Sequence, residues 1–118
     1  MLKWVFLCHL VIGFASSPTS APKLPESFLP VPLVRQATSY SCGAAALLGI
    51  LYYWKVYNDD ETSLYDRLET TPEEGTAPDN IVKVARQFGL KAYKRENLSL
   101  SDLRKALKRG QTVILSLQ

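Results

Sequence analysis

The chain has 118 residues and a formal net charge of +3, with 47% hydrophobic and 21% charged residues. These values are ordinary for a globular protein and leave room for one small domain with a packed core. The 14 lysines and arginines are spread along the chain, and no basic run is interleaved with aromatic residues. The composition therefore argues against nucleic acid as a partner.

The first residues have the pattern of a targeting segment. Lys3 gives a positive start, residues 4–15 are an apolar stretch, and small residues follow. This layout is typical of a secretory signal, and the stretch is short for a membrane span. We expect residues 1–15 to be a signal peptide cleaved before Ser16, so that the protein is exported to the periplasm or the cell exterior. The alternative is an uncleaved anchor that holds the protein at a membrane.

Cleavage of the signal would change the number of reactive side chains. Cys8 would leave with it, and Cys42 would remain as the one thiol of the mature chain. An internal disulfide would then be excluded, although export places a protein where disulfides persist. The one histidine of the sequence, His9, also lies within the signal. We therefore expect no metal site, and no motif indicates a cofactor.

The remaining chain divides into an arm and a domain. Residues 16–30 are rich in proline and have no helical periodicity, which predicts an extended arm or linker. The domain is expected over residues 31–118. Its first residues, 31–36, could form a short edge strand.

Hydrophobic periodicity and capping residues predict several helices in the domain. Residues 43–57 are apolar on nearly every face, which predicts a buried central helix beginning at Ser41 or Cys42. Further helices are expected over residues 62–70, capped by Thr62 or Ser63, over 76–88, capped by Thr76, and from a Ser99–Asp102 capping box through Lys108.

Two segments predict strands late in the chain. Residues 90–95 (LKAYKR) look like a short amphipathic strand, and residues 112–117 (TVILSL) look like a buried one. Helices followed by late strands indicate an α+β fold whose sheet is incomplete. The apolar strand over 112–117 would have an unpaired edge to which another chain could add a strand.

Cys42 stands at the junction between a polar turn and the predicted central helix. The amino terminus of a helix favours negative charge, and a thiol attacks as its thiolate. Gly43 would leave room for a substrate beside the sulfur. Gln36, six residues upstream, could direct its side-chain amide at an oxyanion that forms beside the sulfur, with the Cys42 backbone N–H as the second donor. The pattern favours Cys42 as a catalytic nucleophile over a buried structural cysteine.

The segment VPLVRQATSYSCGAAALLGILYYW resembles the active-site segment of the bacteriocin-processing, double-glycine cysteine peptidase family, a papain-like group, and the resemblance continues through residues 75–118. It implies an incomplete papain-like α+β fold and hydrolysis of peptide or protein substrates through a thioester. It also implies Cys42 as nucleophile and Gln36 as oxyanion-hole donor, without a metal or cofactor.

The same resemblance implies a general-base histidine and an aspartate that orients it, and the sequence has neither at a matching position. The acidic group at 59–61 is expected at the far end of the central helix, roughly 25 Å from Cys42 at about 1.5 Å per residue. We therefore expect the chain alone to be a weak or inactive peptidase, since no group takes the thiol proton or protonates the leaving amine.

The sequence is also compatible with two functions other than peptide hydrolysis. The chain could be a secreted, non-catalytic module that binds a peptide or a complementing chain through strand pairing at residues 112–117. Alternatively, Cys42 could be a redox sensor, although no resolving cysteine lies near it in the sequence.

Overall fold

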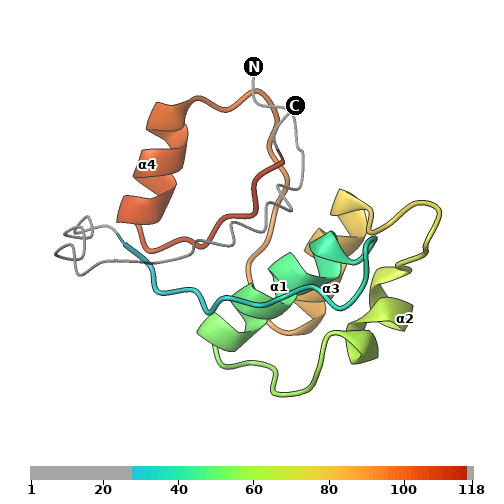
Figure 1. The fold of residues 1–118 in the computed structure, drawn as a ribbon. Coiled ribbons are helices and arrows are strands. Elements are labelled where there is room, and N and C mark those ends of the chain that lie inside the picture. Colours follow the sequence, from blue (N-terminus) through green and yellow to red (C-terminus); the bar gives the residue numbers. More distant parts are fainter. Residues whose placement is uncertain (1–27, 117–118) are drawn as a thin grey trace, which may run out of the picture.

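The computed structural model describes residues 28–116, whose helices follow one another in the order α1, η1, α2, α3 and α4 (Figure 1). Within this range the helices are joined by turns and irregular segments that contain only isolated bridge residues. The predicted signal peptide (1–15) and most of the predicted arm (16–30) lie outside the described residues. No helix among residues 28–116 is long and apolar enough to cross a membrane.

Helix α1 (Cys42–Tyr53) is the central element, and most of its residues are buried, as its composition predicts. It begins where the sequence indicates but stops before the predicted end at Tyr57. Lys55 adopts a left-handed conformation (φ 56°), and the Val56 amide donates back to the Leu51 carbonyl at 3.1 Å. This closure satisfies a carbonyl of the last turn, and it ends the helix without the glycine that usually occupies such a position.

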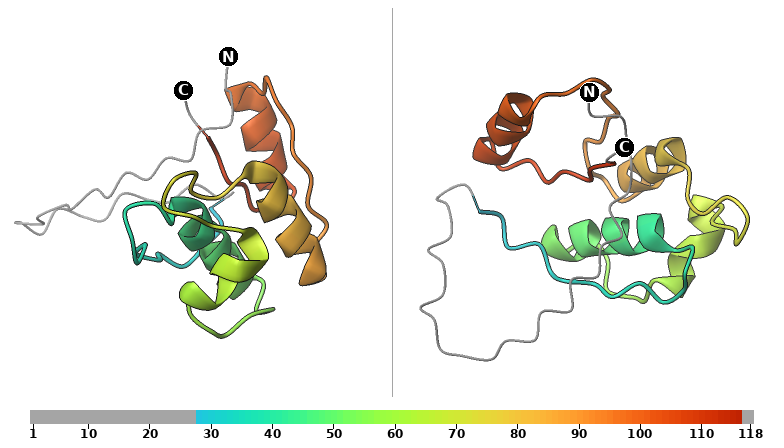
Figure 2. Two further views of the ribbon diagram at one scale, coloured as in Figure 1. Left: turned by 90° about the vertical axis from the view of Figure 1, so that its right-hand side faces the viewer. Right: turned by 45° about the horizontal axis from the view of Figure 1, so that its top comes forward.

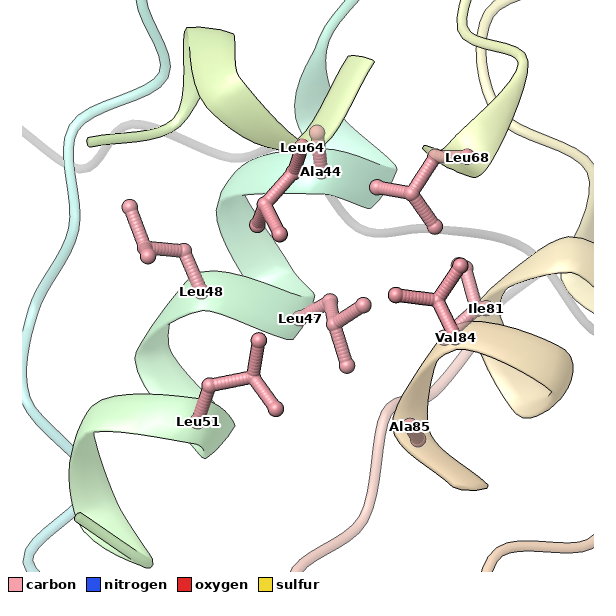
Figure 3. Close-up of a cluster of buried hydrophobic side chains, with 9 residues drawn as sticks. All are labelled: Ala44, Leu47, Leu48, Leu51, Leu64, Leu68, Ile81, Val84 and Ala85. Atoms are coloured by element: carbon pink, nitrogen blue, oxygen red, sulfur yellow. The ribbon is translucent and has the colours of Figure 1, made fainter. Parts of the chain in front are cut away.

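The hydrophobic core lies among α1, η1, α2 and α3. Figure 3 shows nine buried side chains that converge from these elements. They are Ala44, Leu47, Leu48 and Leu51 of α1, Leu64 of η1, Leu68 of α2, and Ile81, Val84 and Ala85 of α3. Burial of these apolar groups is the main favourable contribution to folding, and it fixes α1 between its neighbours.

The predicted helix over 62–70 forms as two short pieces, η1 (Thr62–Leu64) and α2 (Tyr65–Leu68). Neither predicted cap is right: Glu61 is the N-cap residue and makes no side-chain bond to the helix, and Asp60 contacts the first turn instead. Its Oδ1 accepts hydrogen bonds from the Thr62 hydroxyl at 2.8 Å and from the Ser63 amide at 3.0 Å. These bonds, the one from the Thr62 side chain first, hold the pKa of Asp60 below its ordinary value.

Helix α3 (Pro78–Gln87) begins with proline at its first position, where no intrahelical N–H bond is lost. Its N-cap is Ala77 and not the predicted Thr76. The Thr76 side chain is buried instead, and its hydroxyl shares a hydrogen bond with the Thr70 hydroxyl at 2.8 Å. The helix gives way to Gly89, which has a φ of 85°, as the sequence predicts.

Helix α4 (Leu100–Lys108) begins with the predicted capping box, in which Ser99 and Asp102 satisfy each other's backbone N–H groups. Bonds from the Ser99 backbone and then from its side chain hold the pKa of Asp102 below its ordinary value. In Figure 1 and in the right-hand view of Figure 2, α4 stands apart from the helices that form the core. No residue of α4 is buried, which agrees with this position.

The predicted strands do not form in this structure. Residues 31–36, 90–95 and 112–116 have no regular secondary structure apart from a bridge residue at Ser116, and none pairs along its length with another segment of the described chain. Residues 112–115 are half-exposed and not buried, and Leu117 lies outside the described residues. A strand depends on a neighbour for its backbone hydrogen bonds, and no described segment supplies one. The described chain is therefore helical with almost no strand, and the α+β, papain-like fold class is not confirmed.

Candidate active site

Cys42 is the first residue of α1, and its side chain is half-buried. Cys42 forms no disulfide bond, and it is the one cysteine among residues 28–116. The first turn of a helix has backbone N–H groups without intrahelical partners, and the helix dipole adds positive potential there. The sulfur therefore lies beside backbone N–H groups that can donate hydrogen bonds to a negatively charged oxygen of a bound substrate.

A compact turn over residues 37–41 leads into α1. Ser41 is fully buried, and its hydroxyl accepts a hydrogen bond from the Thr38 amide at 3.1 Å. The Ser41 hydroxyl is therefore hydrogen-bonded to Thr38 within the turn, and it does not cap a backbone N–H group of α1. The N–H groups of the first helical turn are consequently not occupied by a serine cap, which keeps this helix end suited to binding an anionic oxygen.

Gln36 lies immediately before the turn and is half-buried. Its Nε2 donates a hydrogen bond of 2.7 Å to the Thr38 carbonyl. A side-chain amide has two N–H donors, so this bond uses one and orients the group while the second stays available. No hydrogen bond joins the amide to Cys42 within the described residues. The structure thus places Gln36 and Cys42 at the two ends of one turn.

Glu61 lies beside the turn before Cys42, although the sequence predicts it at the far end of the central helix. It is only 5% exposed, and its Oε2 accepts a hydrogen bond from the Ala37 amide at 2.9 Å. Residues 54–60, after α1, fold back so that Glu61 contacts the turn before Cys42. The predicted separation from Cys42 is therefore wrong for Glu61, because it extended the central helix in a straight line through residues that are not helical, whereas the Asp59 carbonyl stays near the end of α1 and accepts a hydrogen bond from the Tyr52 hydroxyl at 2.6 Å.

Tyr65 completes this arrangement. Its hydroxyl donates a hydrogen bond of 2.8 Å to Glu61 Oε1, and its ring lies 6.3 Å from that of Tyr40, centroid to centroid. Burial is the main cause that raises the pKa of Tyr65 above its ordinary value, so the phenol keeps its proton and acts as a donor. A glutamate four residues before a tyrosine, at the start of a helical stretch, was the sequence signal for this pair.

Gly43 has a packing role that differs from the one predicted. It is buried, and a Cβ atom built on it would lie 2.7 Å from the Thr76 Cβ and 3.4 Å from the Ile81 Cδ1. The missing side chain therefore lets the start of α1 approach Thr76 and α3 closely. The sequence predicts that glycine is needed here to leave room for a substrate beside the sulfur, but this does not explain the close contact with Thr76.

We expect Gly43→Ala to lower the free energy of unfolding by about 1–3 kcal/mol, because a contact of this length forces the two backbones apart. The better helix propensity of alanine, worth about 1 kcal/mol, offsets only part of this loss. The measurement is urea denaturation followed by circular dichroism. Gly49→Ala is the matched control, since its Cβ would meet the Pro32 carbonyl at 3.1 Å, in an exposed segment that can shift. Equal stability of the two variants would contradict the packing role of Gly43.

Within residues 28–116, no group of three histidine, cysteine, aspartate or glutamate side chains is placed to hold a metal ion.

The comparisons with known proteins identify the family. The model of the peptidase C39 family matches residues 30–115, which is most of the chain. The chain therefore belongs to the peptidase C39 family, and its domain is cysteine peptidase-like. Neither the search of curated proteins nor the search of solved structures finds a match. The resemblance to bacteriocin-processing cysteine peptidases is thus confirmed at the level of the family.

Proposed function

We propose that this chain carries the nucleophile and oxyanion-binding part of a cysteine peptidase that acts on peptides or proteins. The observation that supports this most is the position of Cys42, half-buried at the start of α1 and directly after a hydrogen-bonded turn. Gln36, at the other end of the turn, supplies a side-chain donor, and the Cys42 backbone N–H supplies the second. Membership of the peptidase C39 family supports the same assignment.

The reaction begins with attack of the Cys42 thiolate on a substrate carbonyl carbon. The new S–C bond places a negative charge on the carbonyl oxygen, and collapse of this intermediate breaks the bond to the leaving group and gives a thioester. An amine leaves only when it receives a proton, whereas a nitrophenolate leaves as an anion. The one histidine of the sequence, His9, lies outside the described residues. We therefore propose that this chain acylates readily with activated esters but cleaves peptides weakly or not at all.

The test is incubation of the purified full chain carrying Cys8→Ser, so that Cys42 is its one thiol, with an N-acyl peptide p-nitrophenyl ester and with the matching peptide amide. The ester is expected to release about one equivalent of nitrophenolate in a burst and to leave one acyl group on the protein, as in an acyl-enzyme. Intact mass spectrometry and peptide mapping would locate the acyl group at Cys42. The proposal fails if no adduct forms or if the acyl group is found only on lysines.

A second candidate function is that of a non-catalytic binding module, and a cavity favours it. A cavity of about 660 Å³ lies between the second half of α1, α3, α4 and residues 111–116, and Cys42 is not among the residues that line it. Its lining combines apolar side chains such as Leu103 and Ile114 with a group of basic ones, namely Lys91, Lys94, Arg95, Lys105 and Arg109.

The charges around this cavity indicate the chemistry of its occupant. Lys94 is paired with Asp79 at 2.8 Å, and the other basic side chains of the lining have no ion pair within residues 28–116. Asp102 is the one acidic residue of the lining, and it belongs to the capping box. The occupant in this alternative is an extended, acidic and partly apolar segment of a complementing chain that pairs with residues 112–117. Binding of such a segment would persist in Cys42→Ala, which separates this function from the catalytic one.

We further propose that the protein is exported and that residues 1–15 direct this step, with membrane association through the same segment as the alternative. The support is the charge and hydropathy pattern of that segment.

A further inference from the structure

The Glu61 carboxylate is the most deeply buried acidic group near Cys42. It is 5% exposed, and each of its two oxygens has a defined partner, the Ala37 amide at 2.9 Å and the Tyr65 hydroxyl at 2.8 Å. A buried carboxylate is costly unless hydrogen bonds replace its water. The hydrogen-bonded carboxylate of Glu61 lies at the turn before Cys42 and is not part of the hydrophobic core.

The bond to Ala37 anchors the turn from outside. Within the turn, Thr38 contacts both Gln36 and Ser41, so these residues form one hydrogen-bonded unit. Without an external anchor this unit could shift as a whole relative to the start of α1. The Glu61 bond fixes it at Ala37, directly after Gln36.

The position of Glu61 is itself fixed by its hydrogen bond with Tyr65. Tyr65 is the first residue of α2, which also contributes Leu68 to the core. The carboxylate is therefore held by an element whose position the core determines. A chain of contacts runs from the core through Tyr65 and Glu61 to the turn that bears Gln36.

We propose that Glu61 is a positioning residue that sets the Gln36 amide relative to Cys42 and thereby shapes the oxyanion hole. This inference depends on the proposed function, because it assigns Glu61 a role in the same acylation reaction. Glu61 itself does not touch the reacting atoms. Its effect is confined to steps in which an oxyanion forms.

The test compares two reactions of the same thiol in the full chain carrying Cys8→Ser, so that Cys42 is its one thiol. Acylation by a p-nitrophenyl ester passes through an oxyanion, whereas alkylation by iodoacetamide does not. In acylation the S–C bond forms, the ester C–O bond breaks, nitrophenolate leaves and the thiol proton passes to solvent. The measured quantity is the ratio of the two rate constants, which cancels differences in thiol exposure and nucleophilicity.

We expect Glu61→Ala to lower this ratio about tenfold, since displacement of a catalytic group by about 1 Å has effects of this order or larger. Gln36→Ala should lower it by at least as much. Glu61→Gln keeps an oxygen acceptor for the Ala37 amide, and its new NH₂ can donate to the Tyr65 hydroxyl. This variant should therefore restore the ratio to within about twofold of the parent, because both bonds of the original group can form.

Asn80→Ala is the matched control for lost stability. Asn80 Nδ2 also makes two hydrogen bonds, to the Leu68 carbonyl at 3.0 Å and to Glu69 Oε2 at 2.9 Å, but neither reaches the turn. This variant should leave the ratio unchanged. A low ratio in Asn80→Ala, or in Glu61→Gln as much as in Glu61→Ala, would overturn the positioning role.

The result for Gln36→Ala separates the inference from the proposed function. If Gln36→Ala lowers the ratio and Glu61→Ala does not, the inference fails and the oxyanion hole stands. If Gln36→Ala leaves the ratio unchanged, the assignment of Gln36 fails, and the role of Glu61 through Gln36 fails with it.

Discussion

Cys42→Ala is expected to abolish acylation of the chain by a peptide nitrophenyl ester, with loss of both the nitrophenolate burst and the mass adduct. The reason is that the thiol of Cys42 is the one strong nucleophile at the amino terminus of α1. Cys42→Ser should also fall below detection, because a hydroxyl without a neighbouring base is a weak nucleophile. Intact mass spectrometry over a time course measures both effects.

Cys8→Ser is the matched control for this experiment, since it removes the other cysteine of the sequence and should leave the adduct unchanged. Neutral hydroxylamine provides a chemical check, because it removes an acyl group held as a thioester and spares an amide on lysine. An adduct that survives in Cys42→Ala, or one that resists hydroxylamine, would contradict the nucleophile assignment.

Leu47→Ala is expected to lower the free energy of unfolding by about 3 kcal/mol, within the range of about 2–5 kcal/mol for buried leucines. Leu47 is 1% exposed and lies in the part of the core where α1 faces Val84 of α3 (Figure 3). Its removal leaves a cavity between the two helices. Because small domains have total stabilities of about 5–15 kcal/mol, this is a large fraction of the whole. Urea denaturation gives the value.

Leu100→Ala is the matched control, since it is also a leucine in a helix but is 64% exposed at the start of α4. We expect a change of no more than about 0.5 kcal/mol, as is usual for surface substitutions. Similar losses in Leu47→Ala and Leu100→Ala would show that the core does not lie between α1 and α3.

The start of α1, the capping box of α4 and the stop at Gly89 could all be predicted from the sequence. Each depends on residues close together in the chain, so the physical cause is visible in a short window. The buried character of α1 is equally visible, because its composition leaves no polar face. The candidate residues Cys42 and Gln36 were found in the same way, from their spacing and the helix that follows.

The predicted strands over 31–36, 90–95 and 112–117 failed for the opposite reason. Their residue types favour an extended backbone, but the described parts of these segments form no strand. Pairing depends on a partner from elsewhere, however, and β-branched residues cannot supply one locally. The early end of α1 could not be predicted because Lys55 adopts the left-handed conformation that ends the helix. A glycine usually occupies this position and marks the end of a helix in the sequence, but here a lysine does.

The sequence by itself determined which segments contain helices, that the thiol stands at the start of the central one and which family the chain resembles, because these properties follow from local pattern and chemistry. Only the tertiary structure decided that Glu61 reaches the turn before Cys42 and that Gly43 is required by Thr76. Both contacts join residues distant in sequence, and they arise because the chain reverses after α1 and packs α2 and α3 against it. Close packing in the core fixes such contacts, and no short segment of the sequence contains both partners.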